Sequence, residues 1–171
     1  MKRTREEKFM REALKSAKRG FSDGEVPIGA VVVYQDKVIS RGYNRRTKWQ
    51  LATAHAEMLA IDKACKKFRS WRLPEGAELF VTLEPCPMCM GACLNARVDK
   101  VYFGAYEQKG RSLTKEIADA NLLNHKTEVV GGVLQDECSG ILTAFFSSMR
   151  QKQKEEKALK TTEENFSDNE I

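Results

Sequence analysis

Two stretches of sequence, TAHAE at residues 53–57 and LEPCPMC at residues 83–89, contain the groups around which the chain is organised. Zinc binds His nitrogen and Cys sulfur in tetrahedral geometry, and a catalytic zinc has three protein ligands with water at the fourth position. The two stretches supply such a set, and we expect one zinc ion to be held by His55, Cys86 and Cys89.

The prolines of the second stretch suit a metal site. Proline is favoured at the first position of a helix, so Pro87 predicts that Cys86 is the N-cap and that Cys89 lies in the first turn. The N-terminal end of a helix favours negative charge and lowers thiol pKa values. Both cysteines are therefore expected to bind as thiolates. With a neutral His55, the two thiolates balance the charge of Zn²⁺.

Glu57 lies two residues after His55, so on a helix the two side chains point in different directions. His55 can then hold the metal while Glu57 reaches toward the water at the open position. A carboxylate beside such a water can take its proton and pass it to a leaving group. Glu57 is the candidate catalytic residue.

Other uses of these residues stay open. A Cys-x-x-Cys pair can be a redox centre or half of a structural zinc site. A closed structural site needs a fourth ligand, and Cys93, one helical turn beyond Cys89, is the obvious candidate. His125, the second of the two histidines, is the alternative metal ligand, although it more often would be a surface or loop residue.

Composition indicates a globular protein that keeps its thiols reduced. The 171 residues are 42% hydrophobic and 31% charged, which suits one domain of about residues 1–160. No apolar run approaches membrane-spanning length, and no hydrophobic signal core follows the basic start. The five cysteines are an odd number, and at least two have a better use than a disulfide. A reducing cytoplasmic location is expected.

The charge is unevenly distributed along the chain. The net charge is +5; residues 1–19 carry eight basic and three acidic side chains, and residues 150–160 carry five and two. A basic excess of this size is often only a solvated surface, and nucleic acid is one further interpretation. Residues 161–171 carry four acids and no base, and we expect this tail to be disordered.

The hydrophobic pattern alternates between strands and helices. An amphipathic helix is expected over residues 4–20, with Gly20 at its C-terminal stop, followed by a hairpin of residues 28–34 and 37–41. Thr53 is expected to cap a helix that runs to about Phe68. The later expected elements are a strand at 78–83, a helix to about 97, a strand at 98–104, a short strand at 128–130 and a helix from about 134. This order indicates an α/β fold with parallel pairing and helices over the sheet.

His-x-Glu followed by Pro-Cys-x-x-Cys is the signature of the zinc nucleobase deaminases. Within that superfamily the chain resembles the bacterial tRNA-specific adenosine deaminases from about residue 5 to about residue 155. The resemblance includes the metal motifs and residues 25–30, 42–45 and 103–105. It implies the cytidine-deaminase-like fold, a three-layer α/β/α sandwich with a five-stranded mixed sheet. It also implies a homodimer with one zinc per subunit, and the anticodon stem-loop of tRNA as partner.

The resemblance also implies substrate contacts. Val26 would pack near the base, and Asn44 would contact the target nucleoside, although an Asn in a loop is more often a turn residue. Glu107 occupies the place of an acidic residue that contacts the sugar, commonly Asp in the family. Backbone N–H groups at the start of a metal-bearing helix, such as that of Ala56, could steady the base or intermediate.

The last helix has two adjacent aromatic residues and a basic end. Core packing is the ordinary expectation for Phe145 and Phe146, but adjacent residues cannot both face one core, so Phe145 is the candidate to stack on an anticodon base. Arg150, Lys152 and Lys154 continue the helix and could reach tRNA phosphates.

The implied activity is hydrolytic deamination of adenosine to inosine at the wobble position of a tRNA. Zinc would acidify a water, and Glu57 would take its proton and return protons to the ring and the departing ammonia. A deaminase of free guanine or cytidine is the alternative, because guanine deaminases share a similar EPCPMC segment. A third hypothesis, of another class, is a zinc-stabilised RNA-binding module without turnover.

Overall fold

A computed structural model describes residues 4–108, 113–120 and 123–167. Its centre is one five-stranded sheet with the strand order β2-β1-β3-β4-β5. Strands β1 and β2 form an antiparallel hairpin, β1 and β3 are also antiparallel, and β4 pairs in parallel with both β3 and β5. The strands are β1 (Gly29–Tyr34), β2 (Lys37–Tyr43), β3 (Glu78–Leu83), β4 (Lys100–Ala105) and β5 (Glu128–Val130).

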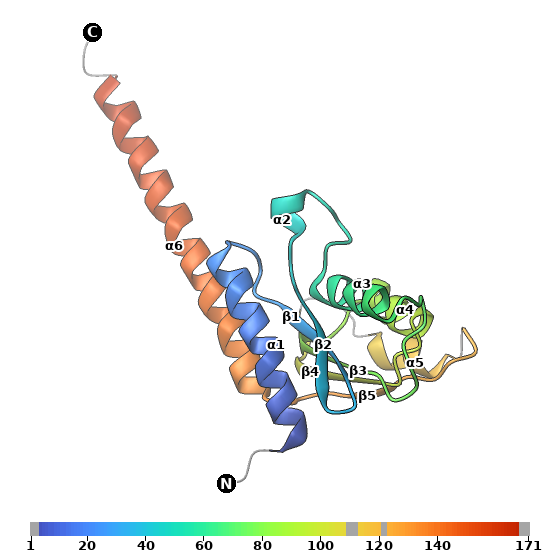
Figure 1. The fold of residues 1–171 in the computed structure, drawn as a ribbon. Helices are drawn as coiled ribbons and strands as arrows, with labels where there is room; N and C mark the ends of the chain where they lie inside the picture. The colour runs from blue at the N-terminus through green and yellow to red at the C-terminus, as the bar shows by residue number, and fades with distance from the viewer. Residues whose placement is uncertain (1–3, 109–112, 121–122, 168–171) are drawn as a thin grey trace.

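Helices cover both faces of the sheet (Figure 1). One face packs against α1 and α6, and the other packs against α3, α4 and α5. The expected three-layer sandwich with a mixed sheet is therefore confirmed. The helices are α1 (Arg5–Ser22), α2 (Arg46–Trp49), α3 (Ala56–Phe68), α4 (Pro87–Asn95), α5 (Thr114–Asp119) and α6 (Gln135–Ser167).

Strand β1 shows why both layers are needed. Successive side chains of a strand point to opposite faces of its sheet. Val32 lies in the cluster formed with α3 and α4, whereas Val31 and Val33 lie in the cluster formed with α1, and all three are fully buried. A strand that is apolar on both sides is stable only when both faces are covered.

The hairpin and the first helix follow the sequence closely, with one difference. Gln35 and Asp36 take positive φ angles of 47° and 57°, as a two-residue hairpin turn requires. Thr4 and Glu7 form a reciprocal capping box at the start of α1. The expected stop at Gly20 is wrong, because α1 continues to Ser22. Gly20 is buried inside the helix instead and faces Tyr43.

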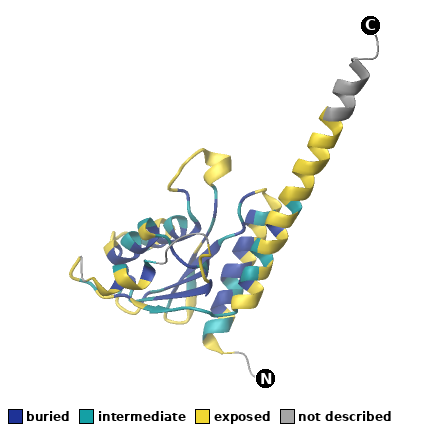
Figure 2. Cartoon of the chain, turned by 180° about the vertical axis from the view of Figure 1, so that it is seen from behind, coloured by how far each residue is buried: buried dark blue, intermediate teal, exposed yellow. Residues whose placement is uncertain are grey.

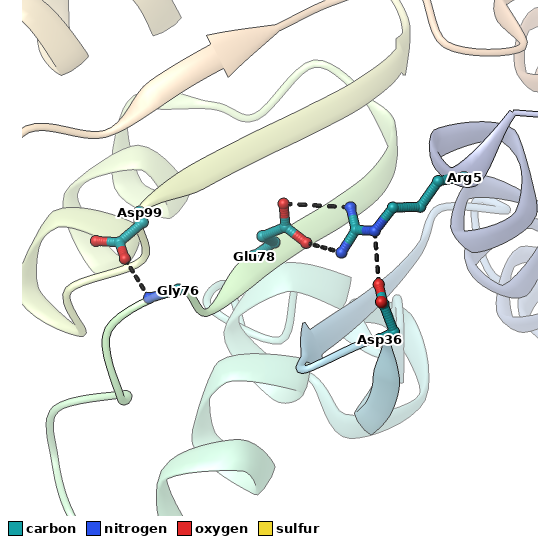
Figure 3. A network of polar contacts seen from close by, with 5 residues as sticks. All are labelled: Arg5, Asp36, Gly76, Glu78 and Asp99. Carbon is teal, nitrogen blue, oxygen red and sulfur yellow. Dashed lines mark hydrogen bonds and ion pairs between the residues drawn. The ribbon is translucent and has the colours of Figure 1, made fainter.

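Arg5, in the first turn of α1, joins that helix to one end of the sheet, at the β1–β2 turn and the start of β3. Its guanidinium donates to Asp36 at 2.6 Å and to Glu78 at 3.3 and 2.5 Å (Figure 3). Hydrogen bonding to Glu78 raises the pKa of Arg5. The pair with Asp36 is exposed and adds little stability, whereas Glu78 is largely shielded from solvent.

Helix α6 extends well beyond the body of the protein. Residues 149–160 are all exposed (Figure 2). The helix ends at Ser167. We expected disorder from residue 161, but residues 161–167 belong to α6. Residues 168–171 lie outside the described residues. Residues 150–160 are rich in Lys, Glu, Gln and Ala, which have high intrinsic helix propensity. No helix among the described residues is long and apolar enough to cross a bilayer.

The packing of β2 against α3 predicts that Gly42 tolerates no side chain. A methyl group there would overlap the carbonyl oxygen of Ala56 and lie 2.8 Å from the amide nitrogen of Ala60. Because these are backbone atoms, Gly42→Ala should lower the free energy of unfolding by about 1–3 kcal/mol. Urea unfolding measures this. Gly140→Ala is the control, since its methyl group meets nothing within 4 Å. Equal stability of the two variants would contradict this packing.

Candidate active site

The site forms where two helices begin beside one end of the sheet. Strand β3 leads into Cys86, which is the N-cap of α4 with Pro87 in its first turn, as predicted. His55 is the N-cap of α3, with φ −80° and ψ 154°. The prediction that Thr53 caps this helix is wrong, because the carbonyl of Thr53 accepts the N–H of His55 at 2.7 Å and the N-cap is His55, two residues later.

Three expected metal ligands lie together. The Nδ1 atom of His55 lies 3.7 Å from the sulfur of Cys86 and 3.6 Å from that of Cys89. All three ligand atoms lie within 4.8 Å of one another. Tetrahedral zinc with bonds of about 2.0–2.1 Å to nitrogen and about 2.3 Å to sulfur separates the nitrogen from each sulfur by about 3.5–3.6 Å. The donor set and its spacing therefore fit zinc.

The two thiols differ in acidity because they share one hydrogen bond. Hydrogen bonding from Cys89 lowers the pKa of Cys86 to about 4, and His55 contributes in the same direction. The same contact raises the pKa of Cys89, and hydrogen bonding to Cys86 raises the pKa of His55. One thiol is thus already anionic at neutral pH, and a bound cation would deprotonate the other.

The alternative ligands lie elsewhere. Within the described residues, the cluster with ligand spacing consists of His55, Cys86 and Cys89 alone. Cys93 is fully buried in the core, and that burial raises its thiol pKa. His125 bonds through Nε2 to the carbonyl of Val98 at 2.9 Å. Neither Cys93 nor His125 belongs to the ligand cluster, so the structure does not show a metal site with four protein ligands.

Glu57 faces the same cavity as the ligands. It lies in the first turn of α3 and is only 4% exposed. It lines a cavity of about 420 Å³ together with His55 and Cys86. Burial raises the pKa of its carboxyl group. A buried carboxyl group of raised pKa beside a metal site suits proton transfer.

Four of the expected substrate-binding residues line this cavity: Val26, Asn44, Glu107 and Arg150. Asn44 is 4% exposed, and its side-chain oxygen has no hydrogen-bond partner in the structure. A buried amide oxygen of this kind is costly unless a ligand pairs with it. The volume and the few polar groups are typical of a small-molecule or nucleobase pocket.

Two of the expected contact residues, Phe145 and Ala56, do not line this cavity. Phe145 is buried and packs edge-on against Phe21 with 5.4 Å between ring centroids, which agrees with the expectation of core packing for this residue. Phe146, which is 37% exposed, lines the cavity instead. Ala56 is fully buried and its side chain is not in the cavity wall. A role for its backbone N–H stays a prediction.

Sequence reasoning missed the residues that hold the cavity wall in place. Glu25 is 1% exposed, and its carboxylate accepts the backbone N–H groups of Thr47 at 3.2 Å and Lys48 at 2.6 Å. It thereby caps the short helix α2 from across the fold. Glu84 likewise accepts the backbone N–H of Glu107 at 3.1 Å. No local signal reveals either contact, because each joins segments more than twenty residues apart.

The mixed sheet and the three-ligand site at two helix starts define a deaminase-like zinc protein. Residues 3–105 match the cytidine and deoxycytidylate deaminase zinc-binding region, and the chain belongs to this family. It is similar to the tRNA-specific adenosine deaminase of Bacillus subtilis, with 51% identity over 153 residues that cover 88% of this chain and 94% of that protein. The corresponding enzyme of Aquifex aeolicus is 42% identical, covering 84% and 95%.

Comparison with solved structures also finds deaminases. A chain from a study of A-to-I editing by tRNA:A34 deaminases superposes with a TM-score of 0.72 and 39% identity, covering 79% of this chain and 99% of that chain. Guanine deaminase from Bacillus subtilis superposes with a TM-score of 0.55 and 39% identity, covering 58% of this chain and 64% of that chain. The overlap with the guanine deaminase is therefore shorter.

The three-ligand set predicts that the protein binds one zinc ion per chain. It also predicts that replacing a ligand cysteine removes the zinc, whereas replacing Cys93 does not. Cys89→Ala removes one of three ligands, so zinc should be lost on dialysis. Cys93→Ala, one turn along the same helix, should retain it. Elemental analysis of the dialysed proteins measures both. Loss of zinc from the Cys93 variant would restore the closed-site hypothesis.

The buried cap predicts that Glu25→Gln is destabilising. The amide keeps one acceptor oxygen but turns an N–H group toward a backbone donor. The free energy of unfolding should fall by about 1–3 kcal/mol. The exposed Glu75→Gln makes the same charge change and should have little effect. Thermal unfolding separates the two, and equal stability would show that the cap is dispensable.

Proposed function

We propose that this protein is a zinc-dependent hydrolase that deaminates adenosine to inosine at the wobble position of a tRNA anticodon. The observation that carries the proposal is the site itself. It combines three ligands spaced for zinc with a buried carboxylate in one nucleobase-sized cavity. Similarity to tRNA-specific adenosine deaminases over most of both chains supports the choice of substrate.

His55, through Nδ1, and the sulfurs of Cys86 and Cys89 would hold the zinc. Bound zinc supplies Lewis acidity, which lowers the pKa of water toward about 7. Glu57 takes a proton from the attacking water and delivers protons to the ring nitrogen and the leaving amine. A C6–O bond forms, the C6–N bond breaks, and ammonia departs, so adenosine and water give inosine and ammonia.

The rest of the cavity wall orients the base. Asn44 offers its unpaired amide oxygen to a donor on the nucleoside. Val26 provides an apolar surface, and Glu107 lies where a sugar hydroxyl could donate to it. Phe146 lies between the cavity and solvent, where an unpaired base can stack on its ring. Arg150 lies at the same rim and is placed to contact a phosphate.

A second candidate is deamination of a free purine, supported by the likeness to guanine deaminase. The tRNA-specific relatives match at 51% and 42% identity over most of both chains, and a free base would not use the cations of α6. A zinc-stabilised RNA-binding module without turnover is the third candidate. The buried Glu57 in the cavity argues against it, because a structural metal does not need a carboxylate at its open side.

We also propose a cytoplasmic homodimer. All five cysteines are free thiols, which suits a reducing compartment. Trp49 and Trp71 are 48% and 63% exposed, and large exposed aromatic side chains are typical of protein or RNA interfaces.

Glu57→Gln tests the proposed chemistry. It should retain zinc and tRNA binding but lose at least about 10²–10⁴-fold in turnover, because glutamine cannot accept the proton. Sequencing total tRNA for inosine after incubation gives the readout, with free guanine and cytidine as competing substrates. If the zinc-loaded Glu57→Gln variant deaminated tRNA as fast as the parent protein, Glu57 would not be the residue that transfers protons. Turnover of the free compounds alone would favour the second candidate.

A further inference from the structure

The face of α6 that lines the catalytic cavity does not end at the cavity. Five α6 side chains form part of the cavity wall, and they recur three or four residues apart, as on one side of a helix. They are Ser139, Leu142, Thr143, Phe146 and Arg150. Beyond Arg150 the same spacing selects Lys154 and Lys157.

These three residues form what we call the basic stripe: Arg150, Lys154 and Lys157. All are exposed, on the part of α6 that projects from the body (Figures 1 and 2). The helical rise spaces them over about 10 Å. Lys152 and Glu155 point away from the stripe, since they lie about 100° or more around the helix from Arg150 and Lys154.

The stripe has the chemistry of a polyanion site. The stripe starts at the cavity, which Arg150 lines, and runs outward along α6. A ligand that fills the cavity and also touches the stripe must therefore be extended and negatively charged along its length. A nucleic-acid strand has this form, and lysine and arginine contacts to its phosphates are independent of sequence. A free base or nucleoside in the cavity would not reach Lys154.

Another helix is a poorer occupant for this segment. Coiled-coil pairing needs apolar residues repeated at two positions of each heptad. Residues 150–160 contain only Ala158 and Leu159 as apolar side chains, and these are adjacent. The segment therefore lacks an apolar seam, and its shared feature is charge.

We propose that the basic stripe binds the phosphate backbone of the anticodon stem while the wobble nucleotide occupies the cavity. This rests on the proposed function. The projecting end of α6 is then a substrate-binding arm that distinguishes a stem-loop from a bare loop of the same sequence.

The test compares two double variants that remove the same net charge. Lys154→Gln with Lys157→Gln neutralises two residues of the stripe. The control is Lys37→Gln with Lys66→Gln, which neutralises one exposed residue at the start of β2 and one in the last turn of α3, both outside α6. Glutamine keeps high helix propensity, and circular dichroism verifies the helix in both.

Deamination is measured on an anticodon stem-loop and on the loop without its stem. The stripe variant should raise KM for the stem-loop about tenfold with unchanged kcat, and its log–log salt dependence should become shallower by about 1.4–1.8, the share of two phosphate contacts. The bare loop should be processed equally by all proteins. The control pair should behave like the parent protein.

Equal KM values for the stripe and control variants on the stem-loop would overturn the proposal. So would a stripe effect of the same size on the bare loop. If the parent protein deaminates neither RNA, the proposed function itself has failed. An unaltered stem-loop KM in the stripe variant, with the parent active, rejects only the substrate-binding arm.

Discussion

The contact of His55 Nδ1 with the sulfurs of Cys86 and Cys89 is the constraint on which the rest of the site depends. These three atoms come from two helix starts that the sheet brings side by side, at distances that suit a tetrahedral zinc. Neither helix start alone has enough ligands. The site therefore exists only while α3 and α4 keep their places against the sheet.

Close backbone packing keeps α3 in place. Gly42 of β2 lets the helix approach to the point where no side chain would fit, and the hydroxyl of Ser40 donates to the carbonyl of Ala60 at 2.6 Å. The loop between β2 and α3 is fixed separately, through the buried carboxylate of Glu25 at the start of α2. As a result Asn44 and Glu57, from different segments, face one cavity.

The parts of the fold and site predicted correctly are those encoded by short-range patterns. Pro87 marks the start of α4, the β-branched run of β1 marks a strand, and the two-residue offset of Glu57 from His55 separates the directions of their side chains. Long-range contacts such as that of Glu25 leave no local pattern. Phe145 and Phe146 differ by about 100° around α6, so choosing the one at the cavity requires the rotation of the packed helix. The helix past residue 160 extends one already formed by the strong helix formers of residues 150–160, because propagation of a helix is easier than its initiation, and the composition of the tail alone does not show this.

The site is a catalytic centre only if the zinc keeps one corner free of protein. X-ray absorption spectroscopy of the zinc-loaded protein measures that coordination shell. An open corner predicts two sulfur ligands at about 2.3 Å and two light ligands at about 2.0–2.1 Å, one from imidazole and one from water. A shell of three sulfurs and one nitrogen, or of two sulfurs and two imidazoles, would contradict it and make the metal structural.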